Sequence, residues 1–89
     1  MAIPDTSHDP AMLALNALVW TLAEPVRANR LLDTTGLSPA ELKASAGDPA
    51  TLAALLGFLE AHEPDLVACA ADIGVPPAAL VAAHRALSA

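Results

Sequence analysis

Apolar residues recur at helical spacing along most of the chain, and no segment alternates as a half-buried strand does. A first apolar stripe consists of Met12, Leu15, Val19 and Leu22, with Leu18 beside it. An equivalent stripe in the second half consists of Leu52, Leu55, Leu56 and Leu59. Between them, a third segment is predicted to bury Ala28, Leu31 and Leu32 and to expose Arg27, Asn29, Arg30 and Asp33. These spacings predict an all-α protein.

Prolines and glycines mark where each helix starts and stops. Proline is favoured at the first helical position, and six pairs fit this rule: Asp9-Pro10, Glu24-Pro25, Ser38-Pro39, Asp48-Pro49, Glu63-Pro64 and Pro76-Pro77. Ser38 and Asp48 are expected to be good N-caps, with Ser38 and Glu41 forming a capping box. Left-handed C-terminal caps are expected at Gly36, Gly47 and Gly74. The predicted helices are 10–22, 25–35, 39–46, 49–61, 64–73 and 77–87.

The two halves of the chain repeat each other. A shift of 39 positions places Asp9-Pro10-Ala11 on Asp48-Pro49-Ala50 and Glu24-Pro25 on Glu63-Pro64. The same shift aligns Gly57 with Leu18, and a close helix contact would explain that glycine. We therefore predict a flexible N-terminal tail, residues 1–8, followed by a single helical domain, residues 9–89. This domain is expected to be a compact bundle of six short helices, built from pseudo-repeated three-helix units at 9–47 and 48–89.

Composition and charge exclude several classes of function. The net charge is −6 and Lys and Arg together number four, so the chain has no basic stripe for nucleic acid or for an anionic membrane surface. No apolar run reaches the length of about 20 residues that spans a bilayer, and the first residues do not resemble a signal peptide, so a cytoplasmic location is expected. The single cysteine, Cys69, excludes an internal disulfide.

The motif Thr35-Gly36-Leu37-Ser38-Pro39-Ala40-Glu41-Leu42, followed by Asp48-Pro49 and Glu63-Pro64, resembles a bacterial family of short all-helical proteins of unknown function. The shared core is Thr-Gly-Leu-x-Pro-x-x-Leu, and the resemblance covers the chain from about Leu13 onward. It implies no catalytic residue. It suggests a regulatory setting, with a signalling protein as one candidate partner.

The side chains that could carry chemistry do not form a convincing site. His62 has Glu60, Glu63 and Asp65 nearby in sequence, but adjacent helical residues point about 100° apart, so an acidic helix junction is the preferred interpretation. His84 lies on an apolar stripe without a nucleophile nearby and is expected to pack half-buried. We therefore expect no catalysis, no metal and no cofactor.

Four residues remain as candidate partner contacts: Arg27, Arg30, Leu66 and Cys69. The two arginines share a helix face and either pair locally, with Glu24 and Asp33, or contact an acidic partner. Leu66 and Cys69 occupy repeat positions where the first half is polar, so their face is either buried or an interface. Trp20, the only tryptophan, is expected in the core.

The favoured function is a non-catalytic, cytoplasmic protein-interaction or regulatory module, binding a protein partner or a second copy of the chain. The alternative is a bundle that binds a small apolar ligand or lipid in a pocket between the two units.

Overall fold

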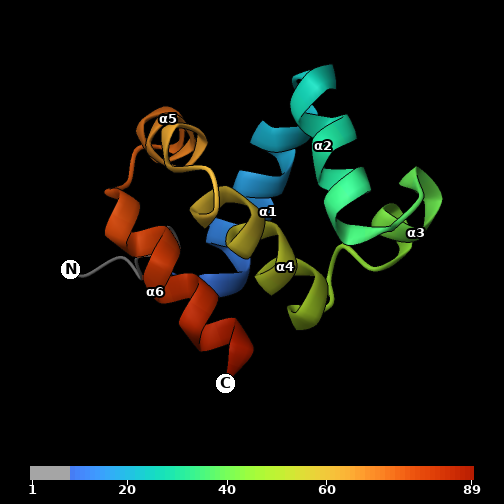
Figure 1. Ribbon diagram of the computed structural model, residues 1–89. Coiled ribbons are helices and arrows are strands. Elements are labelled where there is room, and N and C mark those ends of the chain that lie inside the picture. The colour runs from blue at the N-terminus through green and yellow to red at the C-terminus, as the bar shows by residue number, and fades with distance from the viewer. Residues whose placement is uncertain (1–8) are drawn as a thin grey trace.

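The computed structural model describes residues 9–89, and this part of the chain consists of six α-helices without a strand (Figure 1). The helices are α1 (Pro10–Leu22), α2 (Pro25–Thr35), α3 (Pro39–Ala44), α4 (Pro49–Glu60), α5 (Glu63–Ile73) and α6 (Pro77–Ser88). The all-α prediction is confirmed, and each helix begins within one residue of its predicted start. The predicted tail, residues 1–8, lies outside the described residues. The structure does not show the internal repeat, which stays a prediction.

Helices α1, α4 and α6 pack against one another at the centre of the molecule, and α5 contacts all three. Helix α2 packs on α1 and α4, while α3 lies at the edge of the molecule beside α2 (Figure 1). The core is almost entirely leucine and alanine. Its largest fully buried aliphatic side chains are Leu31, Leu52, Leu55, Leu56, Leu59 and Leu80. The predicted stripe of α4 is therefore confirmed.

Helix α1 presents a different face to the core than the predicted stripe. Its buried residues are Leu13, Ala14, Ala17, Leu18 and Thr21. Met12 and Leu22 are each 43% exposed and Val19 is 68% exposed. Because α1 is apolar on nearly every side, periodicity does not select one face. The small side chains of Ala14 and Ala17 allow neighbouring helices to approach closely, and this contact determines which face is buried.

The capping predictions hold at some helix ends and fail at others. Ser38 and Glu41 form the capping box, with Ser38 Oγ accepting the Glu41 N–H at 3.1 Å. Asp48 makes no side-chain cap, whereas Glu24 accepts the Val26 and Arg27 N–H groups at 3.2 and 3.1 Å. These two backbone hydrogen bonds hold the pKa of Glu24 below its usual value, so the α2 cap is a carboxylate.

Two of the three predicted glycine caps are left-handed. Gly36 has φ 74° and Gly74 has φ 80°, and the Val75 N–H returns to the Ala70 carbonyl at 2.9 Å, as in a Schellman motif. The prediction for Gly47 is wrong: its φ is not positive. Helix α3 ends earlier than expected, at Ala44, with Ser45 as its C-cap.

Gly57 of α4 lies under the imidazole of His84 from α6. A Cβ built at Gly57 would lie 3.4 Å from His84 Cε1 and 3.7 Å from Nε2, which is ordinary van der Waals contact. The imidazole is held there by Glu60, whose carboxylate pairs with His84 Nδ1. The predicted half-buried position of His84 is confirmed.

We expect Gly57→Ala to be tolerated and to stabilise α4 by up to about 1 kcal/mol, because alanine is the better helix former and its methyl group fits. Gly57→Val should instead destabilise the protein by about 1–3 kcal/mol, because its branched methyl groups would press on the imidazole. Chemical denaturation of the two variants measures the difference. Equal destabilisation by both would show that α4 and α6 are packed more tightly here than the structure indicates.

No single helix between Pro10 and Ser88 is both long and apolar enough to cross a membrane. Helices α5 and α6 reach that length and apolarity only as a pair, which is bent by 102°.

Candidate functional site

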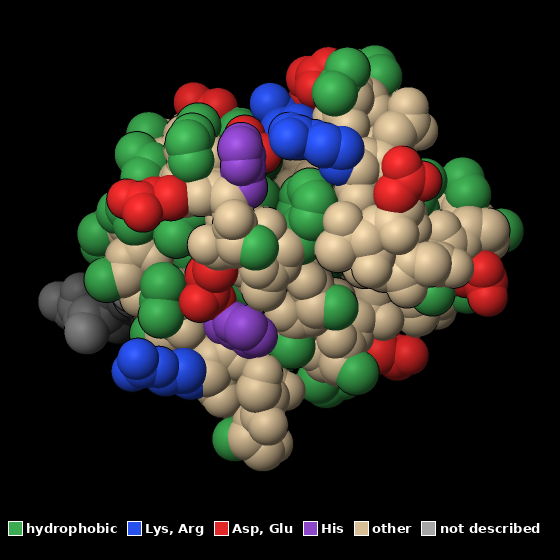
Figure 2. All heavy atoms as spheres, viewed as in Figure 1, with side chains coloured by type: hydrophobic (Ala, Val, Ile, Leu, Met, Phe, Trp, Pro, Cys, Tyr) green, Lys and Arg blue, Asp and Glu red, His purple; other side chains and the backbone are tan. Residues whose placement is uncertain are grey.

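Of the four candidate contact residues, Arg27 and Arg30 lie on α2 and Leu66 and Cys69 lie on α5, and side-chain links join these two helices to each other and to Trp20 of α1. Figure 2 shows basic side chains gathered beside acidic ones at this junction, between α2 and α5. The guanidinium of Arg27 lies over the ring of Trp20, 3.6 Å from its centroid, and Nη2 donates to the Trp20 carbonyl at 2.8 Å. Trp20 Nε1 in turn donates to Asp72 of α5 at 2.6 Å. Trp20 is half-buried, packs against the edge of the core and links three helices, so its predicted core position is confirmed in part.

Arg30 also forms a link within the chain. Its Nη2 lies 3.1 Å from Asp65 Oδ2, so the pair connects α2 to α5 across 35 residues. The expected local pairs of Arg27 with Glu24 and Arg30 with Asp33 are replaced by the Trp20 stack and by Asp65. The side chain of Arg30 is 47% exposed, and an ion pair at such a site contributes at most about 1 kcal/mol. Each guanidinium therefore has a partner within the chain, and that of Arg30 also stays partly exposed.

Leu66 and Cys69 are buried by their own chain. Leu66 is 8% exposed and Cys69 is fully buried. Of the two explanations left open for their apolar face, burial is the one that agrees with this geometry. Burial raises the pKa of the Cys69 thiol to about 11, so the group stays protonated and unreactive at neutral pH.

The acidic side chains near His62 do not converge on a single site. His62 Nε2 lies 3.8 Å from Asp65 Oδ2, a carboxylate already paired with Arg30, and Glu60 is paired with His84. Among residues 9–89, no group of three or more His, Cys, Asp or Glu side chains is arranged to hold a metal ion.

An apolar groove lies between α1, α2 and α3, with a volume of about 440 Å³. Its apolar walls are formed by Leu18, Leu22, Ala28, Leu32, Leu42 and Ala46, and Pro39 and Lys43 complete it. Leu18 and Leu42 are buried, whereas Leu22 is 43% exposed. The groove therefore has a buried aliphatic floor and accessible walls, and binding sites are commonly concave and apolar in this way.

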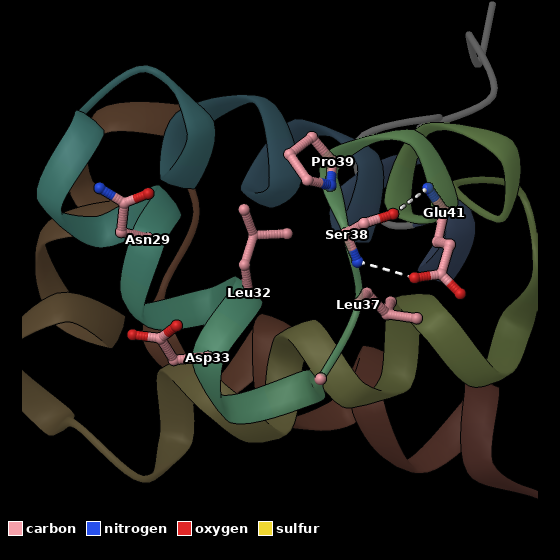
Figure 3. Close-up of a pocket in the computed structure, with 8 residues that line it drawn as sticks. Asn29, Leu32, Asp33, Leu37, Ser38, Pro39 and Glu41 are labelled. Carbon is pink, nitrogen blue, oxygen red and sulfur yellow. Dashed lines mark hydrogen bonds between the residues drawn. The ribbon is translucent and has the colours of Figure 1, made fainter.

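An acidic hollow adjoins this groove, and Leu32 and Pro39 belong to both. Figure 3 shows Asn29 and Asp33 on α2 at one side of the hollow and Ser38 and Glu41 at the other. The Ser38 N–H donates to Glu41 Oε1 at 2.9 Å, and this backbone hydrogen bond, with that from the Ser38 hydroxyl, holds the pKa of Glu41 below its usual value. Asp33 is exposed and makes no hydrogen bond or ion pair with the described residues. The hollow thus carries two carboxylates.

Sequence reasoning missed the groove. The available signal was the surplus of apolar residues on α1, because a short helix cannot bury all of its sides against a few neighbours. The stripe pattern groups Leu18 with Leu22 and does not distinguish Leu18, which is buried in the core, from Leu22, which is 43% exposed.

Comparison with known proteins assigns the chain to a family but does not assign it an activity. The chain belongs to a family described as "Protein of unknown function (DUF3572)", whose model matches residues 7–89. This confirms the resemblance carried by Thr35 to Leu42. No curated protein and no solved structure matches the chain.

Proposed function

Taking membership of a family without an assigned activity as the premise, we propose that this protein is a non-catalytic protein-interaction module. It binds an apolar segment of a partner protein in the groove between α1, α2 and α3. The observation that carries the proposal is the groove itself, an aliphatic hollow of about 440 Å³ whose walls include the accessible side chain of Leu22.

The groove is short, so it fits a single segment of a partner protein better than an extended apolar surface of that partner. One side consists of α3, Pro39–Ala44, which at about 1.5 Å per residue extends for roughly 8 Å, and Ala46 lies just beyond its end. Binding of a helix in an apolar groove is a recurring mode of recognition, with three or four side chains of the helix as anchors. Leu22, Pro39 and Lys43 on its walls are exposed, which favours such a segment over an enclosed lipid.

We also propose that residues 9–47 and 48–89 are related three-helix units, and that their difference leaves the groove open. In the aligned second unit, Gly57 and His84 take the places of Leu18 and Ala46. The His84 ring lies on Gly57 and fills that position. In the first unit the side chain of Ala46 is too small to cover Leu18 in the same way. Helix α3 is also shorter than α6, and this exposes the position of Leu18 further.

The test compares two neutral substitutions at exposed apolar residues, Leu22→Gln in the groove and Val67→Gln on α5. Tagged wild-type and variant chains are used to capture partners from a lysate of the source cells, and each protein found is then measured in a purified binding assay. We expect Leu22→Gln to weaken binding about tenfold or more, because burial of a leucine contributes about 1.5–3 kcal/mol. Val67→Gln should leave affinity unchanged.

Two results would contradict the proposal. A partner that binds wild type and Leu22→Gln equally does not use the groove. Loss of binding in Val67→Gln alone would place the contact surface on α5. Thermal unfolding of both variants establishes that each is folded at the assay temperature.

A further inference from the structure

The charges around the groove narrow the kind of partner that fits it, and this inference rests on the proposed function. The end of the groove at Leu32 and Pro39 opens into the acidic hollow with Asp33 and Glu41. Asp33 and Glu41 are the charged residues that line this hollow, and none of its lining residues is basic. An occupant that extends beyond the groove at this end meets two carboxylates.

These carboxylates are available to a partner. Asp33 is exposed, and among the described residues it has no ion-pair partner, since Arg30 turns to Asp65 instead. Glu41 accepts hydrogen bonds from the Ser38 N–H and hydroxyl, but its side chain is exposed and has no ion-pair partner among residues 9–89. A lysine or arginine that reached this hollow could pair with either group, and the net charge of −6 would assist its approach.

The part of the groove beyond Pro39 differs in charge. Lys43 lies one helical turn beyond Pro39 on α3 and lines the groove there. A basic group on the occupant is therefore attracted to the end at Pro39 and repelled near Lys43. This arrangement gives the occupant a preferred direction as well as a preferred charge.

We infer that the occupant is an amphipathic helix of a separate protein, which lays its apolar face in the groove and places a lysine or arginine in the acidic hollow at Asp33 and Glu41. A second copy of this chain does not fit as well. Of its four basic residues, Arg27 and Arg30 are committed at the α1–α2–α5 junction and Lys43 lines the groove, which leaves only Arg85.

The experiment uses two 14-residue helical peptides with the same leucine-rich apolar face. One carries lysine and the other glutamate at the end of the polar face, and binding to the full chain is measured by fluorescence anisotropy. We expect the lysine peptide to bind more tightly to the wild-type chain. Asp33→Lys should weaken its binding by about tenfold and strengthen that of the glutamate peptide, because the pairing is replaced by repulsion.

Glu63→Lys is the matched control, since it makes the same change in net charge on α5, away from α3. It should alter the affinities of the two peptides far less than Asp33→Lys does. If Glu63→Lys and Asp33→Lys change the peptide affinities equally, the preference for the lysine peptide reflects the overall charge of the protein, and the inference is wrong.

The same assay separates failure of the inference from failure of the proposed function. If both peptides bind the wild type equally and both are lost in Leu22→Gln, the groove binds helices but the acidic hollow does not select them. If neither peptide binds, or if binding survives Leu22→Gln, the groove itself is not the docking site. Concentration-dependent self-association of the chain that Leu22→Gln abolishes would identify the occupant as a second copy and overturn the inference.

Discussion

Leu66→Glu is expected to destabilise the protein by about 3 kcal/mol or more. Leu66 is 8% exposed on α5, and a carboxylate at this position would lose its water without gaining a cation. Glu63 and Asp65 lie three residues and one residue before it on the same helix and would add repulsion. A domain of this size is stable by only about 5–15 kcal/mol, so the loss should appear as a large fall in the denaturation midpoint.

Val67→Glu is the matched control for this prediction. Val67 follows Leu66 on α5 and is 47% exposed, so a charge there stays in water. Its effect should remain within about 0.5 kcal/mol, as for most surface substitutions. If Leu66→Glu were as stable as Val67→Glu, the face of α5 that holds Leu66 would be accessible, and its role as an interface would have to be reconsidered.

Leu31→Ala should produce the second large effect, a loss of about 2–5 kcal/mol of unfolding free energy. Leu31 is fully buried and is the only buried residue of α2, so it anchors that helix to the core. Truncation leaves a cavity under α2, and the links that remain, from Arg27 to Trp20 and from Arg30 to Asp65, are at least partly exposed to water. Because α2 forms one wall of the groove, peptide binding should weaken along with stability.

Val26→Ala tests whether this effect is specific to the anchor. Val26 lies on the same helix and is 62% exposed, so its loss should change stability by less than about 0.5 kcal/mol. Comparable losses for Leu31→Ala and Val26→Ala in urea denaturation would contradict the assignment of Leu31 as the anchor of α2.

Helix number and helix ends could be predicted because the signals are local. Proline at the first helical position, the Ser38–Glu41 capping box and the left-handed Gly36 and Gly74 each act within one turn of a helix end. The buried face of α4 could be predicted as well, since its leucines form a single stripe.

The groove and the junction could not be predicted, because they depend on contacts between residues far apart in the chain. Arg30 meets Asp65 across 35 residues and Trp20 meets Asp72 across 52, and neither pair has a local signature. The orientation of α1 depends on which neighbours pack closely against Ala14 and Ala17. The groove follows from both the orientation of α1 and the shortness of α3, which becomes evident only once the helices are assembled.

The fluorescence of Trp20 can be used to follow the structure around it without an added label. Its indole is covered by the Arg27 guanidinium on one side and hydrogen-bonded to Asp72, so its emission depends on α1, α2 and α5 staying together. Circular dichroism, in contrast, follows all six helices. If α2 detaches before the rest of the bundle unfolds, the fluorescence transition will precede the dichroism transition, and the interval between them will measure how independently the wall of the groove moves.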